Sequence, residues 1–292
     1  RAPGREGRSW AHERQRRTQA MTMVKRIPFP GRWDIWAGAC IVLAGAALRF
    51  YRLADQNLWF DEYVGGVGFL GASTYSLYSA LIDVLSAGLT PPVYFFLQYV
   101  WSRVVGEDIL LLRMLPMAFG LFSLPLAYAV GARVFGRTAG LAAMFCFAVA
   151  PAQIWEAKTL RFYAPMMFFC ALSAYLFVRA LQDGRFRWWA GCLAVNVVAV
   201  FTHFFSLFLV LAEMVSLLAI VRTRFRTAAA WISLQLLCIA PLFLKMYLNP
   251  PLVVMEEPFR WGNFIDCFCG ESQWALAGLF EFQMLAMSAM MA

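Results

Sequence analysis

The sequence of 292 residues contains little charge: 14% of its residues are charged, whereas 62% are hydrophobic. Soluble domains carry a charge on about 25% of their residues. A water-soluble fold could not hide so much apolar surface, because a folded surface needs polar groups toward solvent. The composition therefore excludes an ordinary soluble domain and predicts an integral membrane protein with many transmembrane helices. The eleven Trp and ten Tyr residues suit the membrane interfaces, where amphipathic rings settle.

Patterned cysteine is also absent. Most of the seven cysteines fall inside apolar runs, where a thiol packs as a small hydrophobe. Cys267 and Cys269 are too close for an easy disulfide and too isolated for a zinc site, so cysteine indicates no metal or redox function. Strand signals, internal repeats and low-complexity tracts are lacking as well. The sequence therefore predicts an all-α fold, a polytopic transmembrane helical bundle.

The net charge of +8 raises the question of nucleic-acid binding, but the distribution of the charge argues against it. Many Arg and Lys residues fall within 1–32, and the other basic residues lie mostly between apolar runs. This pattern is typical of orientation signals and lipid headgroup contacts, so membrane lipid is an expected partner and nucleic acid is not. We expect 1–32 to be a basic cytoplasmic segment, partly disordered or non-native. Residues 33–272 would form the transmembrane domain, and 273–292 the start of a further, truncated transmembrane helix.

Membrane-spanning helices need about 20 mostly apolar residues. The uncharged or nearly uncharged runs are 35–48, 114–132, 139–155, 162–178, 188–212, 214–221 and 228–244. Basic loops lie on the cytoplasmic side of membrane proteins, which places the N-terminus and the loops 133–137, 179–187 and 222–226 inside. Since both ends of 188–221 are then inside, this stretch is predicted to be a hairpin with its tip near His203.

One apolar segment, 91–106, does not fit this alternation. If it crossed the membrane, every later basic loop would lie outside. We therefore expect 91–106 to form an amphipathic or re-entrant helix on the outer side.

The predicted topology brings ionisable residues from three distant loops to the outer membrane face. They are Asp61 and Glu62, then Glu156, Lys158 and Arg161, and finally His203. Charges beside hydrophobic spans are costly unless they are solvated, paired or used. The alternative for the Asp61–Glu62 pair is a helix N-terminus, where carboxylates are favourable.

The two cations of the second loop suggest an anion site. Lys158 and Arg161 are three residues apart and can share a helical face, where they would repel each other unless an anion such as phosphate lies between them. The alternative for Lys158 is simple snorkelling toward the headgroups. His203 has two interpretations, a site residue or a turn residue. Glu213 lies near mid-membrane, either as a functional group or as a protonated acid bonded to a neighbour.

Four stretches of the chain follow one another in an order that resembles a known family. They are LRFYRLADQNLWFDEYVGG (48–66), TPPVYFFLQYVW (90–101), the stretch 112–169 with its segment WEAKTLRFYAP, and FTHFFSLFLVLAE (201–213). The series resembles the GT-C membrane glycosyltransferases, in particular the bacterial relatives of the protein O-mannosyltransferase and aminoarabinose-transferase group. The resemblance covers residues 33–250.

The resemblance implies a GT-C-like fold, a polyprenyl-phosphate sugar donor and a lipid, glycan or protein acceptor. It also implies a multi-pass enzyme of the bacterial inner membrane with its active site on the outer face. Asp61 would be the catalytic base, with Glu62 beside it. Arg161 would bind the donor phosphate, with Lys158 in support, because a phosphate that leaves as an anion needs cations. Tyr163, which completes the Arg-aromatic-Tyr motif, would contact the donor or acceptor together with His203 and Glu156.

Two departures from the family pattern leave the metal and the acceptor open. Thr159 stands where relatives often carry an acidic residue, and Thr90 stands where many have a His before Pro-Pro. Both changes remove potential contacts to a divalent metal ion or to the acceptor, so the sequence settles neither a metal requirement nor the acceptor. The competing hypothesis for the function is a polytopic transporter or lipid flippase. Such proteins typically show two related halves, which this sequence lacks.

Overall fold

The computed structural model describes residues 31–55, 57–58, 62, 92–220 and 225–248. Within them the chain is helical, without strands. The helices are α2 (Arg32–Phe50), α6 (Pro92–Val105), α7 (Ile109–Phe135), α8 (Arg137–Val149), α9 (Pro151–Lys158), α10 (Tyr163–Asp183), α11 (Phe186–Thr202), α12 (Ser206–Ile220) and α13 (Phe225–Leu248). The predicted all-α fold is thereby confirmed. Residues 1–30 of the predicted N-terminal basic segment and the predicted C-terminal helix over 273–292 lie outside the described residues.

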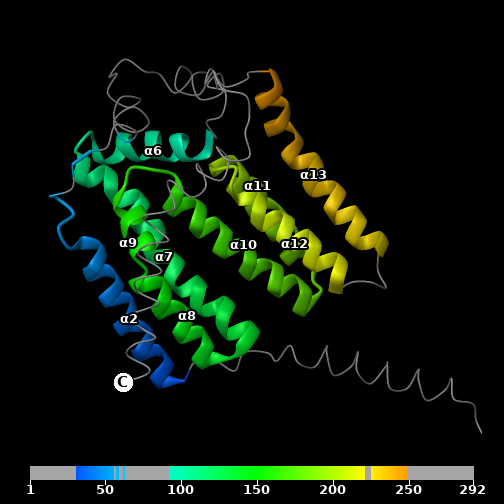
Figure 1. Ribbon diagram of the computed structural model, residues 1–292, viewed down its shortest axis with the longest axis horizontal. Coiled ribbons are helices and arrows are strands. Elements are labelled where there is room, and N and C mark those ends of the chain that lie inside the picture. The colour runs from blue at the N-terminus through cyan, green and yellow to red at the C-terminus, as the bar shows by residue number, and fades with distance from the viewer. Residues whose placement is uncertain (1–30, 56, 59–61, 63–91, 221–224, 249–292) are drawn as a thin grey trace, which may run out of the picture.

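The long helices run alternately up and down and form a bundle (Figure 1). Helix α7 packs against α8 on one side and α10 on the other, and α10 packs against α11. Among the described residues, three helices are long and apolar enough to cross a membrane, namely α2, α7 and α10. The bent pair α8–α9 makes a fourth if it counts as one span, and the shorter apolar helices lie in α11, α12 and α13.

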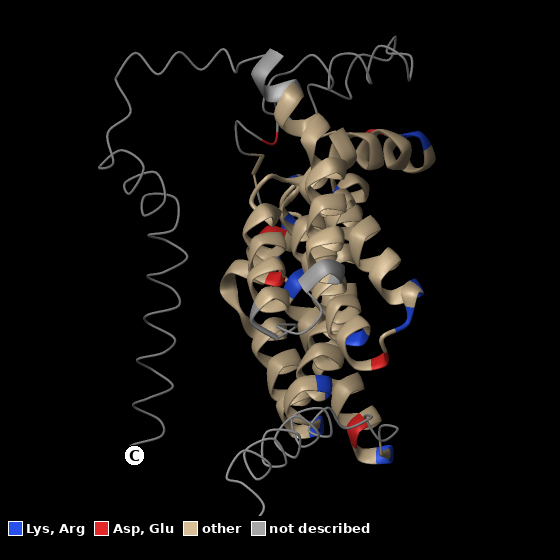
Figure 2. Cartoon of the chain, turned by 90° about the vertical axis from the view of Figure 1, so that its right-hand side faces the viewer, with Lys and Arg blue, Asp and Glu red and all other residues tan. Residues whose placement is uncertain are grey.

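The outer surface of the bundle is apolar, as expected for helices that face lipid. Most of the helical body in Figure 2 is free of charged residues. Several large hydrophobic side chains are strongly exposed on it, among them Leu43, Phe122, Phe145, Val215 and Leu237. A soluble protein rarely shows so much contiguous apolar surface. This observation supports the membrane assignment made from composition.

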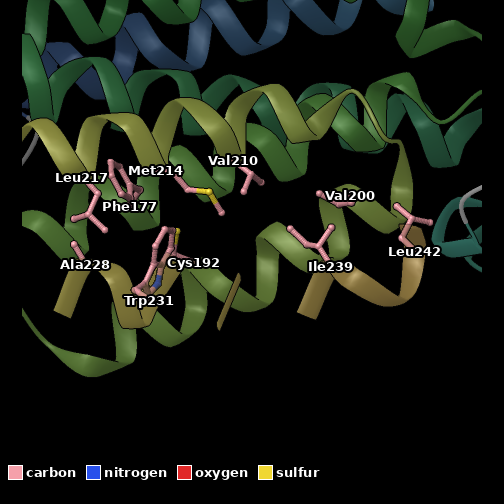
Figure 3. Packing of buried hydrophobic residues seen from close by; sticks show 10 residues of the cluster. All are labelled: Phe177, Cys192, Val200, Val210, Met214, Leu217, Ala228, Trp231, Ile239 and Leu242. Atoms are coloured by element: carbon pink, nitrogen blue, oxygen red, sulfur yellow. The ribbon is translucent and has the colours of Figure 1, made fainter. Parts of the chain in front are cut away.

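The largest buried cluster joins α10, α11, α12 and α13 (Figure 3). Its members are Phe177, Cys192, Val200, Val210, Met214, Leu217, Ala228, Trp231, Ile239 and Leu242. Trp231 packs edge-on against Trp189, with ring centroids 5.6 Å apart. The hairpin that the sequence predicts over 188–221 is confirmed, because α11 ends at Thr202 and α12 begins at Ser206.

The span predicted over 139–155 is broken. Helix α8 ends at Val149, α9 begins at Pro151, and the two axes meet at 55°. Proline occupies the first turn of α9, where it is tolerated, but it cannot continue the hydrogen-bond ladder of α8. Hydrophobicity alone does not reveal this break, because both halves are apolar.

Arg49 of α2 is completely buried at this break. Its Nη1 donates to the carbonyl oxygens of Gly45 and Ala148, each at 3.0 Å, and its Nη2 donates to the carbonyl oxygen of Phe147 at 3.2 Å. The last carbonyls of a helix have no partner within the helix. Arg49 thus satisfies the carbonyls that the break leaves open, and it fixes α2 to the end of α8.

Two sets of polar residues mark the two ends of the bundle. At one end, Arg133 of α7 donates to the side chain of Gln182 of α10 at 3.0 Å, and Arg137 lies 3.5 Å from Asp34 of α2. This is the end of the basic loops, which the charge bias predicts to be cytoplasmic. The opposite end holds the C-terminus of α2, the turn between α9 and α10 and the turn between α11 and α12.

Helix α6 confirms the prediction that residues 91–106 form a helix apart from the alternation of spans. It is 14 residues long and lies across the upper ends of the other helices in Figure 1. Tyr94, Phe95 and Gln98 form its buried face. Helix α6 therefore covers the end of the bundle to which the sequence assigns the polar site residues.

Candidate active site

The turn between α9 and α10 is the centre of the candidate site. Helix α9 ends at Lys158, and Thr159 is extended, with its hydroxyl donating to the carbonyl oxygen of Glu156 at 3.1 Å. Leu160 is completely buried and packs with Leu112 of α7. The next helix begins at Tyr163, so the residues between the two helices expose backbone N–H groups that can bind other segments.

Glu62 binds this turn from the loop that follows α2. The backbone N–H of Leu160 donates to Glu62 Oε1 at 2.6 Å. Glu62 Oε2 lies 3.6 Å from Nη2 of Arg113, and both side chains are only 1% exposed. Arg113 Nη1 in turn donates to the carbonyl oxygen of Leu53 at 3.2 Å. Glu62 therefore joins three segments that are far apart in the sequence. Asp61, the residue expected to be the base, lies outside the described residues.

Arg161 lies against aromatic rings. Its guanidinium carbon is 4.8 Å from the centre of the Phe162 ring and 6.0 Å from that of Tyr163. The side chain is half-buried. Such stacking is favourable for the planar guanidinium and holds its charge in a defined place.

His203 closes the site from the turn between α11 and α12. Its ring stacks on Phe162 at 4.3 Å between centroids and on Phe204 at 4.5 Å, and Tyr163 lies at 5.6 Å. The backbone N–H of Phe205 donates to His203 Nδ1 at 3.2 Å. Because Nδ1 accepts, the proton of the neutral ring is on Nε2.

The charge of His203 follows from its surroundings. The side chain is buried, and burial together with the nearby charge of Arg161 lowers the pKa of His203 from 6.5 to about 4. At neutral pH the ring is therefore uncharged. It can donate one hydrogen bond from Nε2, but it does not add a second cation to the site.

Tyr94 of α6 lies in the same aromatic group, with its ring 6.2 Å from that of Phe162. The side chain is 1% exposed. Burial raises the pKa of the Tyr94 hydroxyl, the charge of Arg161 opposes this effect, and Glu62 adds to it. Tyr94 therefore brings a neutral phenol from α6 to within the electrostatic reach of Arg161 and Glu62.

Lys158 and Arg161 do not share a helical face, contrary to the expectation from their spacing. The helix ends at Lys158, so the i,i+3 relation does not apply. Lys158 Nζ donates to the carbonyl oxygen of Tyr51 at 2.7 Å and thereby binds the end of α2. Glu156 lies on α9, where its carboxylate is 3.4 Å from the Thr159 hydroxyl. The structure thus gathers Glu62, Arg161, Tyr163 and His203 around the turn, whereas Lys158 points to α2.

Sequence reasoning missed Arg113 and Tyr94. The prediction treats basic residues outside the loops as headgroup contacts, but Arg113 is 1% exposed and pairs with Glu62. A signal was available: Arg113 and Arg49 lie at the end of their helices that the charge bias assigns to the outer face. A cation in the disfavoured position suggests a specific partner. Tyr94 lies in the stretch TPPVYFFLQYVW that carries the family resemblance, but no role of its own was predicted for it.

The described residues contain no group of three or more His, Cys, Asp or Glu side chains that could hold a metal ion. Asp61 lies outside the described residues.

The fold and the site define a polytopic helical membrane protein whose polar residues meet at one end of the bundle. Residues 90–247, which reach from the start of α6 almost to the end of α13, match the family described as dolichyl-phosphate-mannose-protein mannosyltransferase. The match covers more than half of the chain, so the chain belongs to this family, which confirms the resemblance found in the sequence.

A curated relative comes from Bacillus subtilis (strain 168) and is named "Putative mannosyltransferase YkcB". It is 28% identical over 181 residues, which are 59% of this chain and 24% of the relative. The chain thus spans about a quarter of the length of this relative. No solved structure matches the chain.

Proposed function

We propose that the protein is a membrane glycosyltransferase that moves a sugar from a polyprenyl-phosphate-linked donor to an acceptor at the outer face of the bacterial inner membrane. Family membership and the similarity to a mannosyltransferase support the general activity. The observation that carries the proposal is the meeting of Glu62, Arg161 and His203 at one bundle end, and Glu62 directly follows Asp61 in the sequence. The opposite end holds the basic turns.

The reaction forms a bond between an acceptor oxygen and the anomeric carbon of the sugar. The bond between that carbon and the phosphate oxygen breaks, and polyprenyl phosphate leaves as an anion. Asp61 takes the proton of the acceptor hydroxyl as general base. Arg161 balances the charge that develops on the leaving phosphate. His203 is neutral, so its Nε2–H orients an oxygen of donor or acceptor and does not act as a cation.

Glu62 serves this site as a positioning residue. It is 1% exposed and already occupied by Arg113 and by the Leu160 N–H, so it is poorly placed to accept a proton from a substrate. Its contacts hold the turn that carries Arg161 and the loop that carries Asp61. Of the two neighbouring carboxylates, Asp61 is therefore the proposed base, and Glu62 is assigned a positioning role and not a part in the reaction itself.

The donor class is tested with membranes that contain the full-length protein. The family name makes mannose the first sugar to use. We expect transfer from polyprenyl-phosphate mannose and no transfer from a nucleotide-linked mannose in lipid-free detergent. Activity with the nucleotide sugar alone would overturn the lipid donor. Movement of a solute across sealed vesicles without sugar transfer would favour the transporter hypothesis.

Arg161→Lys is the companion variant. The planar guanidinium of Arg can bind two phosphate oxygens at once, whereas the Lys ammonium is a compact point charge. We therefore expect the KM for the lipid-linked donor to rise by about tenfold, which corresponds to roughly 1.4 kcal/mol of binding free energy. Lys158→Arg is the matched control, because Lys158 binds the Tyr51 carbonyl and keeps a donor after the change. An unchanged donor KM in Arg161→Lys would remove Arg161 from the phosphate site.

A further inference from the structure

A second polar cluster lies inside the bundle, away from the candidate active site. Glu213 of α12 is 3% exposed and is surrounded by side chains of α10 and α11. Ser173 of α10 lies 2.9 Å from Glu213 Oε1, and Nδ2 of Asn196 of α11 lies 2.7 Å from Glu213 Oε2. Ser173 Oγ also binds Asn196 Oδ1. The three side chains therefore form a closed ring of three contacts, one residue from each helix.

The number of protons in this ring determines whether the carboxyl group of Glu213 is protonated. Each of the three contacts needs one proton between its two heavy atoms. The Ser173 hydroxyl has one proton, and the Asn196 amide supplies one at Nδ2. The third proton has no source other than the carboxyl group of Glu213. If Glu213 were ionised, Ser173 would face two acceptors with a single proton.

The count does not depend on the orientation of the Asn196 amide. If its oxygen and nitrogen are exchanged, the nitrogen serves Ser173, and the hydroxyl serves Glu213 Oε1. The amide oxygen then faces Glu213 Oε2, and this contact needs a proton from Glu213. Cys192 adds a weak donor at 3.6 Å from Oε2, but its proton lies outside the ring.

The surroundings agree with a neutral acid. Among the described residues, no Lys, Arg or His forms an ion pair with Glu213, whereas Val210 and Met214 of the large apolar cluster flank it on α12. An ionised carboxylate without a cation is very costly in such an interior. The Cys192 thiol of α11, 3.6 Å from Glu213 Oε2, cannot supply a positive charge to balance it.

We propose that Glu213 is a buried proton-binding site whose single proton closes the ring and joins α10, α11 and α12. The ring lies about two turns along α12 from its start at Ser206. The same three helices carry Tyr163 and His203 at their outer ends. The bound proton thus helps to hold together the three helices at whose ends Tyr163 and His203 lie.

Glu213→Gln tests the proposal in the full-length protein. The amide of Gln offers an N–H in place of the acid O–H and keeps an acceptor for Asn196, so the ring stays complete. We expect the thermal midpoint of Glu213→Gln to stay within about 2 °C of the wild type. Glu213→Ala leaves Asn196 and Ser173 unsatisfied and should lower the midpoint by about 4–10 °C.

Infrared spectroscopy gives an independent measurement. The wild type should show a carboxylic-acid C=O band that Glu213→Gln lacks and that persists across the pH range in which exposed carboxylates are ionised. Asp108→Asn is the matched control, because Asp108 is an exposed helix cap and its loss should leave the band in place. If Glu213→Ala does not fold, Ser173→Ala should shift the band by removing its hydrogen-bond acceptor.

An ionised Glu213 would overturn the proposal. It would show as a wild-type spectrum without the Glu213 acid band and as a Gln variant that is destabilised as much as the Ala variant. Neither measurement uses sugar transfer. The result is therefore independent of the glycosyltransferase proposal, and either one can fail while the other stands.

Discussion

Two buried glutamates of this protein have nearly equal exposure and opposite surroundings. Glu62 is 1% exposed and faces a cation, Arg113, together with the backbone N–H of Leu160. Glu213 is 3% exposed and faces the neutral groups of Ser173, Asn196 and Cys192. Burial alone therefore does not tell what a carboxyl group does. The partners decide it: Glu62 is part of an ion pair between segments, whereas Glu213 needs a proton of its own.

Asp61 gives the largest expected effect, because it is the proposed catalytic base, whereas Glu62 and Glu213 have structural roles. Asp61→Asn keeps the shape of the side chain but removes its basicity. We expect turnover to fall by about 10²–10⁴ while expression and folding stay unchanged. Sugar transfer from the lipid-linked donor measures it. Wild-type turnover at unchanged expression would show that Asp61 is not the base, since Asn is an equally good helix cap.

Removing the Arg113 cation tests whether the ion pair is what distinguishes Glu62 from Glu213. Arg113→Met leaves a buried carboxylate without its ion-pair partner, and we expect the free energy of unfolding to fall by about 3–5 kcal/mol. Denaturant unfolding in detergent measures this change. The double variant Glu62→Gln with Arg113→Met should recover part of the loss, because the neutral amide still accepts from the Leu160 N–H. A loss below about 1 kcal/mol in the single variant would mean that the pair contributes little.

His203 gives a smaller, pH-dependent effect. Its pKa is about 4 in the folded protein and 6.5 in its ordinary state. Between these two pH values the unfolded chain binds a proton that the folded chain excludes. The contribution of His203 to the free energy of unfolding is therefore fully present above pH 6.5 and is lost as the pH falls toward 4. The loss from this group is about 2–3 kcal/mol. His203→Gln should remove this part of the acid dependence, measured as the difference between the two unfolding profiles. Equal profiles for both proteins would contradict the shift.

The helices could be predicted from the sequence because hydrophobic runs report directly on a membrane environment. The tip of the hairpin near His203 and the separate helix at 91–106 follow from the charge bias, and the structure has both. Which face of the membrane each end occupies stays a prediction. The break at Pro151 was not predicted, because the apolar pattern continues through it. The end of α9 at Lys158 was not predicted either, because the spacing of Lys158 and Arg161 was interpreted as a shared helical face.

The site was predictable in its location more than in its contacts. The convergence of Glu62, Arg161 and His203 follows from topology, since alternate loops meet at the same bundle end. The ion pair of Glu62 with Arg113 does not follow from it. The two residues are far apart in the sequence, and the local pattern around Arg113 is that of any basic residue beside a span. Pairings of this kind depend on tertiary packing, to which a single sequence gives no direct access.

Arg49 places a constraint on the assembly of the protein in the membrane. It belongs to the first described helix, but the carbonyl oxygens of Phe147 and Ala148 that it binds are 98 and 99 residues further along the chain. The ribosome therefore delivers the guanidinium long before these acceptors exist. Until α8 arrives, the charge of Arg49 has to be solvated by water or headgroups, since hydrocarbon offers it nothing. Helix α2 can thus settle at its final depth only after α8 has been inserted, so the order in which these two helices leave the ribosome does not set the order in which they are fixed.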